Sequence, residues 1–189
     1  MSSKIFSNVI GFDDAPFPRS YQGLVKIVGA VFAGQRFDGV LIGEIEKDGS
    51  DAAKEIIRIV AESKFAAGIS LIMLQGITMG GFNVIDPFTL HRKLALPVLV
   101  VTRRQPNLES IRKALVNKIP DGEKKWRIIE RIGPMEPVEK IFIQRVGLTM
   151  DQAAQTIRHF TIHSHIPEPI RTAHLIAGAI ADGQSRGCP

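Results

Sequence analysis

The sequence predicts an α/β domain built on a mixed β-sheet that is flanked by helices. The first observation is a set of three apolar runs of strand length near the start, the second and third of which are joined by the short connection 34–36. The second observation is that segments with helical spacing of apolar residues then alternate with buried-type strands. Early antiparallel strands followed by such an alternation are typical of a mixed sheet covered by helices.

The elements are placed by apolar periodicity and by turn residues. Strands are expected at 8–13, 24–32, 37–45, 70–74, 97–102 and 140–146. Helices are expected at 51–64, 86–94, 107–119, around 126, at 149–163 and at 167–182. The short connection at 34–36 predicts that the second and third strands form an antiparallel hairpin. Asp51, Asp86, Asn107 and Thr149 are suitable N-caps, and Gly80-Gly81 is expected to form a loop.

The bulk composition favours a single globular domain over residues 1–189. Hydrophobic residues make up 44% of the 189 positions and charged residues 23%. The apolar runs 70–74 and 97–101 are far too short to cross a bilayer, so no membrane role is expected. The start of the chain has no apolar signal core, and the single cysteine, Cys188, allows no internal disulfide. These features predict a cytoplasmic protein.

The charge balance favours a polyanionic partner. The formal net charge is +5 and the sequence pI is about 9.6. Lysine and arginine neutralise phosphates, so nucleic acid is the expected partner. Arg103 and Arg104, which follow the strand 97–102, are candidate phosphate contacts or a solvated strand end. Trp126, among Lys124, Lys125 and Arg127, is either a core anchor or a stacking platform for bases.

Acidic residues gather where a metal site is expected. Asp13 and Asp14 end the first strand, and Asp48 and Asp51 flank the turn before the first helix. Magnesium takes oxygen ligands, commonly one or two carboxylates together with water and phosphate. These four acids are the candidate metal ligands, with Asp13 and Asp51 expected to share one hydrated cation. The alternative is that Asp14 and Asp48 are turn residues and that Asp51 is an N-cap.

Four segments resemble a known family. They are GFDDAPF at 11–17, KDGSDAAKEI at 47–56, LQGITMGGFNVID at 74–86 and PEPIRTAHLIAGAIADGQSRG at 167–187. Together they look like domain-of-unknown-function family 99, which is regarded as kin to endonuclease V. The resemblance implies an RNase H-like fold and a magnesium-dependent nuclease acting near deaminated purines, in which manganese substitutes for magnesium.

The resemblance also implies roles for individual residues. Asp13 takes the place of the first-strand aspartate, and Asp51, or Glu55, that of the helix-opening glutamate. Gln75 stands where endonuclease V has an aspartate, and Arg103 about where it has a lysine. These matches make Asp13, Asp51 and Gln75 the candidate catalytic residues.

Gln75 leaves two functions open. Its amide has an oxygen for a metal but adds no negative charge, so the chemistry does not follow from the fold. The chain is either a metal-dependent phosphodiesterase acting at a modified or deaminated nucleotide, or an inactive nucleic-acid-binding protein with the same fold. A remoter alternative is a protein-interaction module. The sequence settles neither DNA against RNA nor the oligomeric state.

Three other motifs give weaker evidence for function. Gly80-Gly81 lacks the Gly-Lys-Ser/Thr ending of a phosphate-binding P-loop. His159 and His163 have a spacing that suits zinc, but no nearby cysteine or carboxylate completes a tetrahedral set. His174, on the apolar last helix, is expected to be a hydrogen-bonded structural histidine.

Overall fold

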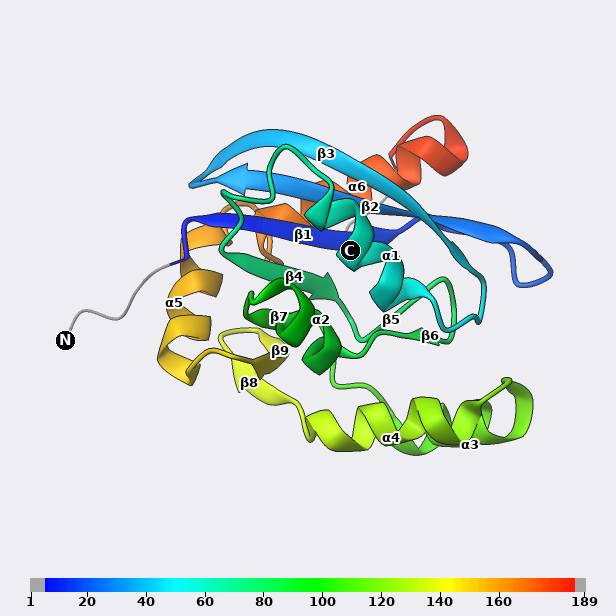
Figure 1. Ribbon diagram of the computed structural model, residues 1–189. Helices are drawn as coiled ribbons and strands as arrows, with labels where there is room; N and C mark the ends of the chain where they lie inside the picture. The colour runs from blue at the N-terminus through cyan, green and yellow to red at the C-terminus, as the bar shows by residue number, and fades with distance from the viewer. Residues whose placement is uncertain (1–5, 186–189) are drawn as a thin grey trace.

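The computed structural model describes residues 6–185, and its centre is a seven-stranded mixed sheet (Figure 1). The strand order is β3-β2-β1-β4-β7-β9-β8. The strands are β1 (Asn8–Asp14), β2 (Leu24–Ala33), β3 (Arg36–Glu46), β4 (Leu71–Gln75), β7 (Val98–Thr102), β8 (Glu136–Val138) and β9 (Ile141–Val146). The predicted α/β class with a mixed sheet is therefore confirmed. Cys188 lies outside the described residues.

Three strands run in parallel at the centre of the sheet. β1 pairs with β4 and β4 with β7 in parallel, whereas β1, β2 and β3 form the predicted antiparallel meander. The carboxyl ends of β1, β4 and β7 therefore meet at one edge of the sheet. Ligand sites in open α/β sheets occur at this carboxyl edge.

Six helices are present in the described part of the chain. They are α1 (Ala52–Ala61), α2 (Pro87–Leu94), α3 (Leu108–Lys118), α4 (Gly122–Ile132), α5 (Met150–Phe160) and α6 (Glu168–Asp182). Asp86 and Asn107 cap α2 and α3 through backbone N–H groups, and Thr149 forms a capping box with Gln152. Three of the four predicted N-caps are thus confirmed. None of the described helices is long and apolar enough to cross a membrane.

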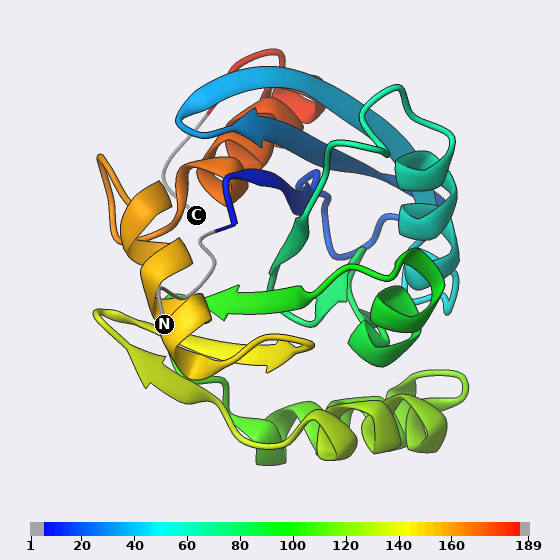
Figure 2. The same ribbon diagram turned by 60° about the vertical axis from the view of Figure 1, so that its left-hand side comes forward.

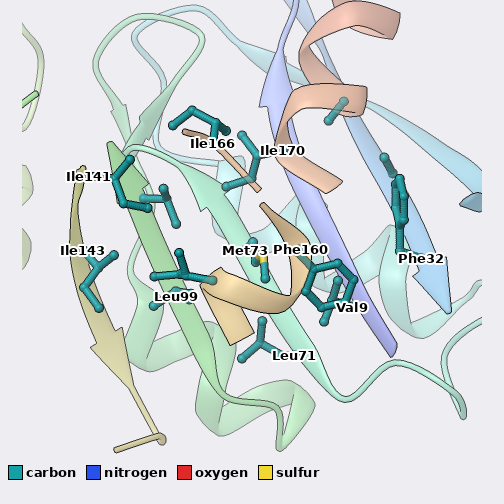
Figure 3. Packing of buried hydrophobic residues seen from close by; sticks show 14 of the residues in the cluster. Val9, Phe32, Leu71, Met73, Leu99, Ile141, Ile143, Phe160, Ile166 and Ile170 are labelled. Atoms are coloured by element: carbon teal, nitrogen blue, oxygen red, sulfur yellow. The ribbon is translucent and has the colours of Figure 1, made fainter. Parts of the chain in front are cut away.

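The helices cover both faces of the sheet. In Figure 2, α5 and α6 lie on one side and α1 and α2 on the other. Alternate residues of each strand supply the two cores, because successive side chains of a strand point to opposite faces. Val9, Leu71 and Met73 pack under α5 and α6, as Figure 3 shows, and Ile10, Ile72 and Leu74 pack under α1 and α2.

The last strands differ from the predicted alternation of helices with parallel strands. β9 is antiparallel to β7, and a short strand that was not predicted, β8, pairs with β9 at the sheet edge. Because β8 is antiparallel to β9, β8 runs in the same direction as β7. The short turn between Val138 and Ile141 then reverses the chain, which makes β9 antiparallel to β7.

Two smaller differences concern the segment after β4 and the end of α1. The predicted loop at Gly80-Gly81 is the turn of a two-stranded hairpin, β5 (Thr78–Met79) and β6 (Asn83–Val84). Both glycines have positive φ, which a residue with a side chain adopts only with strain. Helix α1 ends at Ala61, three residues earlier than expected, and turns follow it.

Candidate active site

Polar side chains gather at the carboxyl edge of the sheet. Asp13 and Asp14 end β1, Gln75 ends β4, and Arg103 follows β7. The register pairs Phe12 with Leu74, so Asp13 and Gln75 are the next pair along the ladder. Residues in line on parallel strands face the same side of the sheet, and this side is the one that α6 covers.

Asp13 is held by a histidine that lies 161 positions away in the sequence. Its Oδ2 accepts a hydrogen bond from His174 Nδ1 at 2.8 Å, and its Oδ1 accepts one from the Asp14 backbone N–H at 2.9 Å. The Asp13 side chain is only 7% exposed, and that of His174 is 30% exposed. The contact with Asp13 raises the pKa of His174, which favours the imidazolium form.

Helix α6 reaches Asp13 because it crosses β1 at a glycine. A Cβ on Gly11 would overlap the backbone of Pro169 and Ile170, so only glycine allows this close approach. From that crossing, four helical residues lead to His174 and two strand residues lead to Asp13. These steps cover about 6 Å and about 6.6 Å respectively, which brings the two side chains to the same level.

Asp14, the last residue of β1, is partly buried between the neighbouring Asp13 carboxyl group and the β5–β6 hairpin. Its Oδ2 accepts a hydrogen bond from the Gly80 backbone N–H at 2.9 Å. Burial, and then the neighbouring charge of Asp13, raise the pKa of Asp14 to about 7. The edge therefore holds two adjacent carboxyl groups, one of which resists ionisation while no cation is bound.

Gln75 brings an unused oxygen to this edge. Its side-chain Oε1 is buried and has no hydrogen-bond partner. A buried amide oxygen without a partner is costly, and such an oxygen in a native protein calls for a ligand, a water or an ion.

The donor set at the edge suits one hydrated divalent cation. Asp13 and Asp14 supply carboxylate oxygens, and Gln75 supplies its unpartnered amide oxygen. Magnesium in enzymes is commonly held by one or two carboxylates and keeps several waters or substrate phosphate oxygens. The raised pKa of Asp14 fits as well, because a bound cation favours its ionised form.

The stability of the metal-free protein is expected to depend on Asp14. In the folded state its pKa is about 7, above the ordinary 3.8, so the folded protein holds this proton more tightly than the unfolded chain does. The contribution of Asp14 therefore becomes less favourable as the pH rises from about 4 to about 7. His174 acts in the same direction, since its stabilising contact is complete below its ordinary pKa and is lost as the pH rises through its raised value.

Thermal unfolding in the presence of EDTA, measured across this pH range, checks this prediction. The melting temperature of Asp14→Asn minus that of the wild type should grow as the pH increases. A difference that is constant with pH would show that Asp14 ionises normally.

Asp48 and Asp51 are engaged in the fold rather than gathered around Asp13. Asp48 Oδ1 accepts a hydrogen bond from the Phe82 backbone N–H at 2.8 Å. Both oxygens of Asp51 lie 3.2 Å from the Glu46 backbone N–H, and Asn83 Nδ2 donates to Oδ1 at 2.6 Å. Each acid therefore ties the turn after β3 to its neighbours.

Two corrections follow for these acids. Asp51 occupies the N-cap position of α1, but its side chain makes no capping hydrogen bond, because it turns back to Glu46. Between residues 6 and 185, no three or more His, Cys, Asp or Glu side chains form a group that could hold a metal ion, so the four predicted acids are not one cluster. A cation shared by Asp13 and Asp51 stays a prediction.

Glu55, the alternative to Asp51, pairs with Arg58, which lowers the pKa of Glu55.

The predicted basic residues separate into two kinds. Arg103 and Arg104 are exposed directly after β7, at the same edge as Gln75. Trp126 is 9% exposed and packs with Leu115 and Ile129, so it is a core anchor. Lys125 is buried as well, and its Nζ donates to the Asp48 carbonyl oxygen at 2.5 Å.

His174 is part of the site, although the sequence predicted only a structural role for it. The expectation of a hydrogen-bonded histidine is confirmed, but its partner, the first-strand aspartate, was not foreseen. Only the crossing of α6 over β1 reveals that partner. The one signal in the sequence was the specific stretch 167–174, which ends at this histidine.

Solved structures share this fold. A crystal structure of a protein of unknown function from Archaeoglobus fulgidus superposes with a TM-score of 0.86 at 37% identity, over 93% of this chain and 99% of that one. Endonuclease V from Ciona intestinalis, solved with an inosine-containing DNA, has a TM-score of 0.57 at 15% identity, over 89% and 82% of the two chains. Human endonuclease V has a TM-score of 0.56 at 14% identity, over 91% and 83%. The predicted endonuclease V-like fold is confirmed.

Sequence comparison identifies the family. A UPF0215 protein from Deinococcus radiodurans is 47% identical over 96% of this chain and 92% of its own length. Another, from Methanothermobacter thermautotrophicus, is 45% identical over 95% and 90%. The label of family 99 stays a prediction, whereas the predicted kinship to endonuclease V is supported. The family model described as Endonuclease dU matches residues 6–181, and the chain therefore belongs to the Endonuclease dU family.

Proposed function

We propose that this protein is a metal-dependent endonuclease that cleaves DNA at deoxyuridine, a deaminated nucleotide. The family description supports the substrate, and the endonuclease V-like fold supports the reaction class. The observation that carries the proposal is the carboxyl edge of the sheet. There Asp13, Asp14 and the unpartnered oxygen of Gln75 lie together, with His174 fixed against Asp13.

Asp13, Asp14 and Gln75 would hold magnesium, with manganese as a substitute. When bound, such an ion lowers the pKa of water and stabilises charge on a phosphodiester that is being displaced. His174 keeps a proton at Nδ1 and so fixes the orientation of the Asp13 carboxylate. Arg103 and Arg104, at the end of the neighbouring strand, would contact the phosphate on either side of the cleaved bond.

Gln75 also supports a second candidate, an inactive protein that binds nucleic acid. At this position endonuclease V has an acid, and a neutral amide weakens the attraction for a strongly hydrated dication. The two candidates make opposite predictions for cleavage and the same prediction for binding.

The deciding experiment is a cleavage assay on a labelled DNA duplex with one deoxyuridine. Matched duplexes carry thymidine or deoxyinosine at that position, and each is incubated with magnesium, manganese or EDTA. The proposal expects a nick near deoxyuridine that needs the metal, leaves the thymidine duplex intact and disappears in His174→Ala. Retained binding without a nick under every metal condition would establish the inactive candidate instead.

A further inference from the structure

The net positive charge of the chain is concentrated in one segment. Residues 103–132 hold nine of the 24 lysines and arginines but only four of the 19 aspartates and glutamates. This segment therefore carries a net charge of +5, and the remaining residues balance fifteen positive against fifteen negative charges. We call residues 103–132, which comprise the loop after β7 with α3 and α4, the basic arm.

The basic arm is a fixed part of the structure. Its two helices enclose a small core of Leu115, Trp126 and Ile129, which continues onto Val84 of the β5–β6 hairpin. The buried Lys125 adds a polar anchor through its hydrogen bond to the Asp48 carbonyl oxygen. The orientation of the arm relative to the sheet edge is thus set by packing and by this bond.

The exposed side of α4 carries a row of cations. Gly122, Lys125, Trp126 and Ile129 form its buried face. At 100° per residue, Lys124, Arg127 and Arg131 fall on the opposite face, where all three are exposed. The row spans about 10 Å along the helix. The acidic residues of α4, Glu123 and Glu130, lie to one side of this row of cations.

Few of the exposed cations of the arm are neutralised by the protein itself. The side chain of Lys124 is 77% exposed even though it pairs with Asp121, and Lys113 pairs with Glu109. Within residues 6–185, Lys118 and Arg127 take part in no salt bridge, and Arg131 stacks over the Phe88 ring at 4.0 Å. This surface attracts a polyanion rather than an internal partner.

The arm starts at the candidate active site. Arg103 follows β7 at the edge where Asp13 and Gln75 lie, and α4 packs against β6 beside Gly80. Figures 1 and 2 show α3 and α4 lying together along one side of the molecule. A long polyanion that reaches Asp13 can therefore extend along the arm.

We infer that the basic arm, through Lys118, Lys124 and Arg127, is a docking surface for the phosphate backbone of double-stranded DNA flanking the site of cleavage. Proteins that hold single strands use exposed aromatic rings as stacking platforms. The only aromatic residue of the arm, Trp126, is buried in its core, so the surface has charge without stacking. A straight row of cations suits the regular phosphates of a duplex. This inference rests on the proposed function for the choice of DNA.

The test measures binding without cleavage. Affinity for a labelled, unmodified DNA duplex is determined in EDTA at several salt concentrations for the wild type and for the triple variant Lys118→Gln, Lys124→Gln, Arg127→Gln. The matched control is Lys64→Gln, Arg92→Gln, Lys93→Gln. It also removes two lysines and one arginine, but from exposed positions at the opposite edge of the sheet.

The arm variant should bind more weakly than the control at low salt. Each lost phosphate contact lowers the slope of log affinity against log salt by about 1, so the slope should fall by about 3 in the arm variant and stay unchanged in the control. For a single strand of the same sequence, the arm substitutions should reduce the affinity and the salt slope by less. Equal slopes for the two variants, or an equal loss with single strands, would overturn the inference.

Cleavage, measured separately with metal, tests the proposed function independently. Arm-dependent duplex binding without any cleavage would leave the inference standing and remove the nuclease proposal. Cleavage at deoxyuridine together with an unchanged salt slope in the arm variant would support the nuclease proposal and overturn the inference about the arm.

Discussion

Replacing Asp13 by asparagine is expected to reduce cleavage at deoxyuridine by at least about 100-fold. Asp13 supplies a buried carboxylate to the proposed cation, and a loss of roughly 3 kcal/mol of charge stabilisation corresponds to that factor. The same change should lower the pKa of His174 toward its ordinary value, because the hydrogen bond to Asp13 is the main cause of its rise. Single-turnover cleavage rates and an NMR titration of the His174 ring measure the two effects.

Asp38→Asn is the matched control for this prediction. Asp38 lies on the edge strand β3 and pairs with the exposed Arg36, so its loss should change neither the cleavage rate nor the titration of His174. A folded Asp13→Asn protein that cleaves within tenfold of the wild-type rate would place the active site elsewhere. A large loss of rate with an unchanged His174 titration would contradict the Asp13–His174 contact.

Gln75→Asp is expected to raise the affinity for magnesium by roughly tenfold or more. The variant adds one negative charge beside Asp13, and a charge pair at partly screened dielectric is worth on the order of 1–4 kcal/mol at contact distance. About 1.4 kcal/mol corresponds to a factor of ten. In the absence of metal, the same charge should lower the melting temperature, because it adds repulsion next to Asp13. Isothermal titration calorimetry and thermal unfolding in EDTA measure these effects.

Two further variants separate charge from side-chain length. Gln75→Asn shortens the side chain in the same way without adding charge, so it should not gain magnesium affinity. Asp13→Asn combined with Gln75→Asp should lose the gain if both residues serve one ion. Equal magnesium affinity in the wild type, Gln75→Asp and the double variant would show that Gln75 does not face a metal, and would favour the inactive nucleic-acid-binding protein.

Local order could be predicted from the sequence because it depends on neighbours in the chain. The caps at Asp86, Asn107 and Thr149 each satisfy a backbone N–H two or three residues away. Uninterrupted apolar runs likewise assigned β4 and β7 to the buried centre of the sheet. Asp13 and Gln75 could be placed at one edge for the same reason, since parallel strands end on the same side.

The tertiary structure decided the contacts that no spacing along the chain encodes. Asp51 looked like an N-cap, yet its carboxylate turns to Glu46 and Asn83, because the hairpin from Thr78 to Val84 brings that asparagine to the turn. The turn from β8 to β9 likewise reversed the chain and made β9 antiparallel to β7.

The partner of Asp13 was decided in the same way. His174 reaches Asp13 only because Gly11 lets α6 cross β1 at backbone contact distance. The sequence by itself therefore determined the fold class and the position of the acidic edge. Packing between distant segments determined which side chains meet there, because a contact across 161 residues depends on the path of the whole chain between them.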